Sequence, residues 1–215
     1  MVKITELLNI ILFSLISIVF VLFPFYAPLY DSSIKLLYIG HLLYMIGLYL
    51  YLTNYPVDLG SYAKVYLLNA DSNRRKKYVI KTVYSYFINV NLYVVLLTIL
   101  TWTVVRGDFR VEIFNLLYTP QHKSFLVSGI TQYVFMNLLY TSIFALLLVF
   151  TNRIYAVLLT FILEIYGLMT DNYLLSPIII YPQISFSTIL VSIIISLCVI
   201  TIIHMRWDKW ILKRI

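Results

Sequence analysis

Long apolar stretches alternate with short polar segments along this chain, and most of the charged residues lie in the polar segments. The hydrocarbon core of a membrane is about 30 Å thick, so a helix needs roughly 20 apolar residues to cross it. Six stretches approach this length, at residues 7–28, 35–53, 83–105, 125–150, 153–169 and 186–205. The pattern predicts an all-α membrane protein with six transmembrane helices, folded as a single transmembrane domain over residues 1–215.

The first apolar stretch begins like a secretory signal, because Lys3 precedes it. The stretch is long, however, and it ends in FPFYAPLYD without the small residues of a cleavage site. We expect it to stay in the protein as a transmembrane helix.

The distribution of Lys and Arg predicts the orientation, because basic loops resist translocation. Twelve of the 16 basic residues fall on one side: Lys3, Lys64, Arg74, Arg75, Lys76, Lys77, Lys81, Arg153, Arg206, Lys209, Lys213 and Arg214. The other side has Lys35, Arg106, Arg110 and Lys123. Both termini are therefore predicted to be cytoplasmic. Trp102 then lies near the outer face and Trp207 and Trp210 near the inner face, as interfacial anchors do.

The composition agrees with a membrane protein, since 62% of the residues are hydrophobic, only 12% are charged, and the mean hydropathy is +0.92. The net charge of +7 lies mainly at the ends of apolar stretches, so it indicates membrane topology and not nucleic-acid binding. The outer segment 170–185 is apolar but is interrupted by Pro177 and Pro182, which predicts a re-entrant or interfacial segment.

The sequence contains no pattern of a catalytic or metal centre. His41, His122 and His204 are scattered, and neither an HExxH motif nor paired aspartates are present. Cys198 has no partner for a disulfide and no basic neighbour within one helical turn. A GxxxxGK[ST] loop for ATP is also missing. We expect no enzyme activity, cofactor or metal in this chain.

The largest cytoplasmic segment is the loop 54–82 between the second and third spans. Residues 57–68 predict a short amphipathic helix on the membrane surface, with an apolar face made by Val57, Tyr62, Val65, Tyr66 and Leu68. Asn69, Asp71 and Ser72 are turn and N-cap residues, after which a helix is predicted to run from Arg74 through Lys81 into the third span.

Four consecutive cations, Arg74 to Lys77, admit two interpretations. They hold the loop inside and attract anionic membrane lipids at about 1 kcal/mol per residue, which by itself explains them. The second interpretation comes from a resemblance to a known family, which the surrounding residues carry.

The stretch LLNADSNRRKKYVIKTVYSY resembles the segment that precedes the third span in ABC-2-type permeases, the membrane subunits of ABC exporters. There a short coupling helix is followed by a Ser/Asn turn, a basic cluster, an aromatic residue and a Lys. Here these are Ser72 and Asn73, Arg74 to Lys77, Tyr78 and Lys81. The short connection VFTNRIYAV, the Pro-broken outer segment and the basic tail MRWDKWILKRI extend the resemblance more weakly.

The resemblance implies a multi-pass permease subunit in a bacterial plasma membrane, paired with a second permease subunit in a homo- or heterodimer. A separate ABC ATPase, which holds ATP and Mg, would dock on the coupling helix. The implied contact residues are Asp58, Ser61, Tyr62, Lys64, Tyr66, Asn69, Arg74, Arg75 and Lys77. The aromatic and aliphatic spans favour a hydrophobic or amphipathic cargo, a peptide or a lipid.

Inserting a charged side chain into a membrane costs about 2.5–3.5 kcal/mol at the centre of a helix, so an ionisable residue inside a span indicates a structural or functional role. Thr160, Glu164 and Gly167 form one stripe of the fifth span that is predicted to face protein or a cavity. By resemblance, the second and fifth spans border the translocation path, which makes His41, Tyr44, Thr160 and Glu164 candidates to line it. A helix-packing hydrogen bond or a buried protonated carboxyl explains Glu164 equally well, and a packed His explains His41. Asn89, Asn91 and Asn137 are predicted to link helices.

Two alternative functions stay open. Glu164 and His41 are compatible with an ion- or proton-coupled secondary transporter, although no internal repeat supports one. A non-transporting immunity or assembly protein of the membrane has no positive feature in the sequence.

Overall fold

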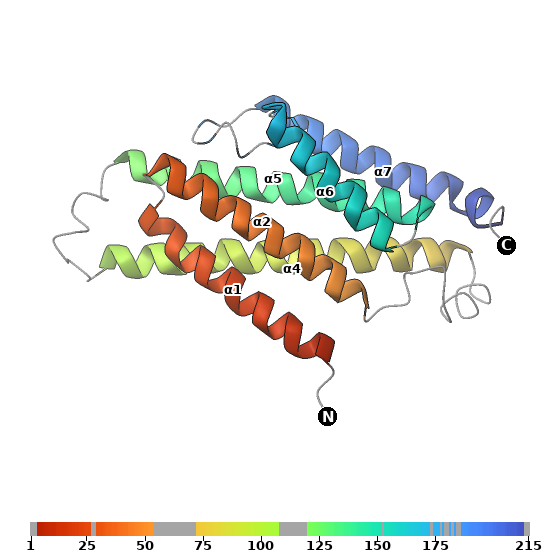
Figure 1. The fold of residues 1–215 in the computed structure, drawn as a ribbon, viewed down its shortest axis with the longest axis horizontal. Helices are drawn as coiled ribbons and strands as arrows, with labels where there is room; N and C mark the ends of the chain where they lie inside the picture. The colour runs from red at the N-terminus through yellow and green to blue at the C-terminus, as the bar shows by residue number, and fades with distance from the viewer. Residues whose placement is uncertain are drawn as a thin grey trace.

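The computed structural model describes residues 4–26, 29–53, 72–107, 120–151, 153–172, 174–176, 178, 181, 183 and 186–212. Six helices make up this part: α1 Ile4–Tyr26, α2 Tyr30–Thr53, α4 Ser72–Gly107, α5 Pro120–Phe150, α6 Arg153–Met169 and α7 Phe186–Leu212 (Figure 1). Within these ranges the chain forms no strand, so the all-α prediction is confirmed for them.

Four helices are long and apolar enough to cross a membrane, and they indicate a membrane protein. Their apolar stretches are Glu6–Tyr26, Asp31–Leu52, Ile80–Thr103 and Ser124–Leu148. The last two helices contain shorter apolar stretches, Ile154–Met169 and Phe186–Ile202. The number of spans beyond four and the orientation stay predictions.

Several helices extend beyond the apolar stretches that predicted them. α4 begins at Ser72, before the apolar stretch that starts at 83 and two residues before the predicted helix start at Arg74, and α7 continues to Leu212, beyond 205. Helix formation depends on backbone hydrogen bonds and not on lipid, so a polar sequence can continue a helix outside the membrane. α5 begins at Pro120, a residue that suits the first helical position because it lacks an N–H group.

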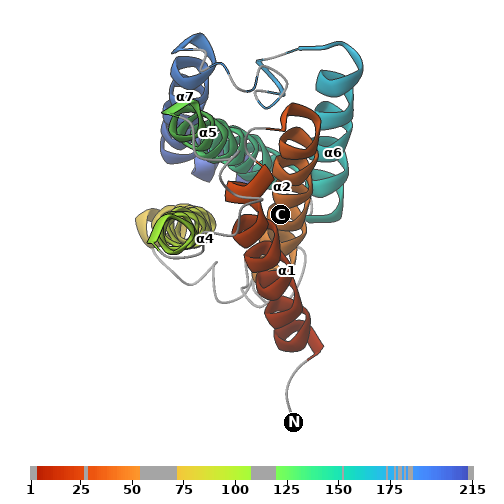
Figure 2. The same ribbon diagram turned by 90° about the vertical axis from the view of Figure 1, so that its left-hand side faces the viewer.

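The helices lie roughly along one long axis, and α2 and α5 occupy the centre of the bundle (Figure 1). α5 packs most extensively against α7, and α1 packs most extensively against α2. Seen end-on, α4 and α6 lie on opposite sides of α2 and α5 (Figure 2). Each central helix therefore has protein on several sides, which is where buried polar groups can be accommodated.

Aromatic rings fill the contact between α1, α2 and α5. The Phe20 ring lies edge-on to the Tyr133 ring, with centroids 4.7 Å apart, and both side chains are fully buried. Gly40 makes this contact possible, because a Cβ there would lie 3.0 Å from Phe20 Cε2. Large apolar side chains on the outer faces, such as Ile10, Leu100 and Ile162, are exposed, as lipid-facing side chains are.

Candidate functional site

The sequence-predicted site residues fall into two groups. Asp58, Ser61, Tyr62, Lys64, Tyr66 and Asn69 lie outside the described residues. Arg74, Arg75 and Lys77 are on the first turns of α4, where only the helical backbone is described. His41, Tyr44, Thr160 and Glu164 all lie inside the bundle.

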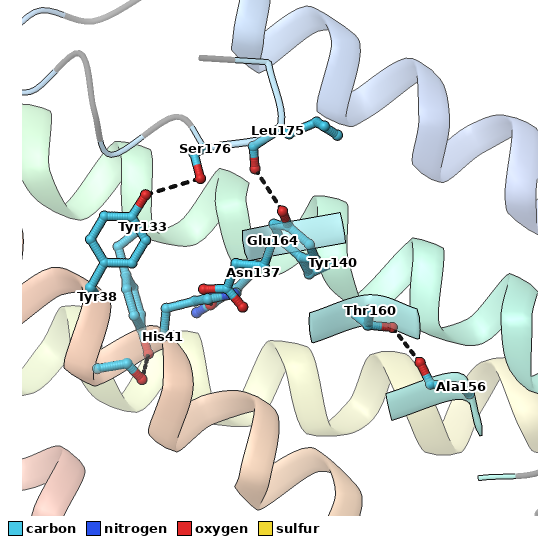
Figure 3. A network of polar contacts seen from close by, with 11 residues as sticks. Tyr38, His41, Tyr133, Asn137, Tyr140, Ala156, Thr160, Glu164, Leu175 and Ser176 are labelled. Carbon is cyan, nitrogen blue, oxygen red and sulfur yellow. Dashed lines mark hydrogen bonds and ion pairs between the residues drawn. The ribbon is translucent and has the colours of Figure 1, made fainter. Parts of the chain in front are cut away.

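His41 of α2 and Glu164 of α6 meet in the centre of the protein. His41 Nε2 lies 3.6 Å from Glu164 Oε2, and the two side chains are 0% and 3% exposed. Figure 3 shows them converging with Asn137 of α5 between the helices. The stripe prediction is confirmed, because Thr160, Glu164 and Gly167 are all buried.

A chain of hydrogen bonds leads from this pair to the backbone of α4. Asn91 Nδ2 donates to the Phe87 carbonyl oxygen at 2.8 Å, and Asn91 Oδ1 accepts from Asn137 Nδ2 at 2.8 Å. Asn137 Oδ1 then faces His41 Nδ1 at 2.7 Å. This chain links α4, α5 and α2 through side chains that were predicted to connect helices.

The Phe87 carbonyl oxygen fixes which atom donates and which accepts in each of these hydrogen bonds. A carbonyl oxygen can only accept, so Asn91 must present its amide nitrogen to Phe87 and its oxygen to Asn137. Asn137 in turn must present its nitrogen to Asn91 and its oxygen to His41. His41 Nδ1 therefore carries a proton, and Nε2 is the nitrogen left to interact with Glu164.

Aromatic rings enclose the imidazole. The His41 ring lies 5.1 Å from the Tyr140 ring and 6.3 Å from the Tyr44 ring, centroid to centroid. The Tyr44 hydroxyl is hydrogen-bonded to Thr141 Oγ1 at 2.5 Å. Thr160 lies one turn before Glu164 and donates to the Ala156 carbonyl oxygen at 2.6 Å (Figure 3). Thr160 hence satisfies its hydroxyl on its own helix and not on the pair.

The end of α6 turns the chain back over Glu164. Asp171 has a φ of 49°, and the Asn172 and Asp171 amides donate to the carbonyl oxygens of Gly167 and Leu168 at 2.8 and 3.3 Å. This is a Schellman ending, in which a short polar residue tolerates the left-handed conformation. The following residues consequently fold back against α6.

Two phenols from neighbouring helices fasten the returning segment. The Tyr38 hydroxyl of α2 donates to Ser176 Oγ at 2.9 Å, and the Tyr140 hydroxyl of α5 donates to the Leu175 carbonyl oxygen at 2.9 Å (Figure 3). We call Leu174 to Ser176 the cover segment. Gly167 allows it to approach, because a Cβ there would lie 2.7 Å from Leu175 Cβ.

Further along the outer segment, Tyr181 is almost completely buried. Burial raises the pKa of Tyr181 to about 12, and a hydrogen bond with Ser33 offsets the rise only in part. The described residues of the predicted re-entrant or interfacial segment are thus packed into the protein at several points.

A second polar cluster, which was not predicted from the sequence, joins α4, α5 and α7. Ser142 Oγ lies 3.0 Å from the Tyr84 hydroxyl and 2.7 Å from Ser196 Oγ. The sequence pattern that could have predicted it is the recurrence of a hydroxyl residue at every fourth position, at Thr188, Ser192 and Ser196. All three side chains are buried. This cluster has hydroxyl groups alone, so it is suited to joining helices.

The prediction that Asn89 links two helices is wrong. Asn89 is exposed and donates to Ser85 Oγ at 3.4 Å within α4. It lies on a different face of α4 from Asn91, because residues at positions i and i+2 of a helix point to different sides. Tyr38, Tyr140 and Ser176 were not identified from the sequence.

Among the described residues no group of three or more His, Cys, Asp and Glu side chains could hold a metal ion. No protein-family model, curated protein or solved structure matches this chain.

Proposed function

We propose that this chain is the permease subunit of an ATP-driven exporter, working with a second permease subunit and a separate ABC ATPase. Six transmembrane helices with both termini in the cytoplasm belong to this proposal. The cargo would be hydrophobic or amphipathic, a peptide or a lipid, because the helices present aromatic and aliphatic side chains. ATP and Mg would be held by the ATPase.

One observation carries the proposal: α4 is a single helix from Ser72 to Gly107, and its apolar stretch begins only at Ile80. The eight residues before Ile80 include the four cations, and at 1.5 Å per residue they extend about 12 Å from the apolar stretch. A displacement of the loop 54–71 would reach the membrane through this unbroken helix. α4 contacts α1, α2, α5 and α7, which would receive the movement.

The test is co-purification from the native membrane in mild detergent. We expect an ABC ATPase, identified by mass spectrometry, to accompany the tagged chain. The D58A/Y62A/Y66A variant should lose it, because the predicted coupling helix then lacks its polar and aromatic contacts. Lys35→Ala is the matched control, since Lys35 is exposed at the opposite end of α2 and should retain the ATPase.

Two outcomes would contradict the proposal. One is the absence of an ABC ATPase from wild-type preparations in several mild detergents. The other is retention of the ATPase by the triple variant at the wild-type level, which would remove the loop from the interface.

A second candidate is a proton-coupled carrier, which the buried contact between His41 and Glu164 favours. Proteoliposomes containing the chain alone distinguish the two candidates. A carrier would produce a proton flux that Glu164→Gln abolishes, whereas an ATP-driven exporter without its ATPase would produce none.

A further inference from the structure

Three buried polar atoms meet at His41 and Glu164 without a hydrogen bond to any described residue. They are His41 Nε2 and the two carboxyl oxygens of Glu164. An ionised carboxylate that is buried and unpaired is very costly, so the protonation of these atoms decides whether the site is tolerable.

The hydrogen-bond chain from Phe87 limits the possible protonation states. Because His41 Nδ1 already carries a proton that it donates to Asn137, His41 Nε2 has either a lone pair or a second proton. With a lone pair, Nε2 can only accept, and Glu164 must be the acid. With a second proton, Nε2 donates to a Glu164 carboxylate.

In both states the two groups together hold one proton besides the one on Nδ1, although Nε2 and Oε2 are 3.6 Å apart, which is longer than a hydrogen bond. Two states remain. One opposes a nitrogen lone pair to an ionised carboxylate, which is repulsive in a buried environment, and the other buries an imidazolium beside a neutral acid without a counter-charge. The other titratable groups at the site are the phenols of Tyr38, Tyr44 and Tyr140. The hydroxyls of Tyr38 and Tyr140 donate to Ser176 and Leu175, and the Tyr44 hydroxyl is bonded to Thr141.

We propose that His41 Nε2 and Glu164 Oε2 form a binding site for one exchangeable proton inside the bundle, and that the bound proton holds α6 against α2. Binding takes the proton from water, and release returns it to water, with no other bond made or broken. α6 packs less extensively against α2 than against α5, and His41 and Glu164 lie at the contact between α2 and α6.

The cover segment controls the access of water to this site. It is fastened by Tyr38 from α2 and Tyr140 from α5, and it fits closely over Gly167. Exchange of the proton therefore requires the cover segment to detach from the phenols. This inference does not rest on the proposed export function, since it concerns the bundle alone.

Nitrogen NMR of a single-histidine protein tests the protonation state. The H122Q/H204Q variant, labelled with ¹⁵N-histidine and placed in phosphatidylcholine nanodiscs, leaves His41 as the only signal. We expect a protonated Nδ1 at neutral pH, both in this protein and after Glu164→Gln. In the Gln variant Nε2 should be an unprotonated acceptor of the Gln amide.

Infrared difference spectra between this protein and its Glu164→Gln variant report the carboxyl group. A neutral His41 with a protonated carboxylic acid, or a doubly protonated His41 with a carboxylate, supports the proposal. An unprotonated Nδ1, or a neutral Nδ1–H imidazole beside an ionised carboxylate, overturns it.

Transfer into D₂O tests the cover segment. Gly167→Val should accelerate deuterium exchange at the pair about tenfold or more, because the added side chain collides with Leu175 and favours the open cover. Met169→Val, on the exposed end of α6, is the matched control and should leave the rate unchanged. Tyr140→Phe removes one fastening hydrogen bond without adding volume, and is the second variant in case Gly167→Val does not fold. Equal rates in the wild type and in every folded variant would overturn the role of the cover segment.

Discussion

Replacing Phe20 with Ala is expected to lower the free energy of unfolding by about 2–4 kcal/mol. Phe20 is fully buried where α1 meets α2 and α5, against Tyr133 and Gly40. A Phe→Ala change in a water-soluble core costs about 3–5 kcal/mol. The cost in lipid should be somewhat smaller, because the unfolded helices are still in an apolar solvent and mainly the lost packing counts. Unfolding in mixed micelles with increasing SDS measures this difference.

Phe186→Ala is the matched control, since it deletes the same atoms from a side chain that is 75% exposed. It should change the free energy of unfolding by less than about 0.5 kcal/mol. Equal losses in the two variants would mean that the ring cluster between α1, α2 and α5 does not contribute to the stability of the bundle.

The helices themselves could be predicted from the sequence, because a helix that crosses a membrane needs a minimum number of apolar residues. Each of the six apolar stretches corresponds to one helix of the structure. Their ends could not be predicted in the same way. The first residues of α4 are polar and basic, so hydropathy does not predict that they are helical. The turn and N-cap residues before Arg74 do predict a helix there, with its start two residues after the observed Ser72. These first residues continue the helix because Ser72 and the residues after it keep the backbone hydrogen bonds of the third span, which no apolar pattern reports.

The centre of the site was partly predictable for a different reason. An ionisable group within an apolar stretch is expensive, so His41 and Glu164 stand out even in a single sequence. Their contact depends on how α2 and α6 pack, which local periodicity does not specify. Tyr38 and Tyr140 could not be singled out among 20 tyrosines, because only the returning segment after α6 distinguishes them.

Replacing His41 with Leu is expected to lower the free energy of unfolding by about 2–5 kcal/mol, because two buried polar groups lose a partner at about 1–3 kcal/mol each. The loss has two parts in this structure. Glu164 keeps a buried carboxyl without a partner, and Asn137 Oδ1 loses the donor that it has at 2.7 Å. The same SDS titration in mixed micelles measures the change.

Glu164 variants separate the pair from simple packing. Glu164→Gln should cost less than about 1 kcal/mol, because the Gln amide can donate to the lone pair on His41 Nε2 and the shape is kept. Glu164→Met has a similar volume without a donor, so it should cost about 1–3 kcal/mol, as expected for an unsatisfied buried nitrogen.

H41L/E164L should be more stable than the two single Leu variants predict by addition, since it removes both buried polar groups together. Additive losses in this cycle would mean that His41 and Glu164 are buried separately and share no proton, because only an energetic coupling between them makes one change alter the cost of the other.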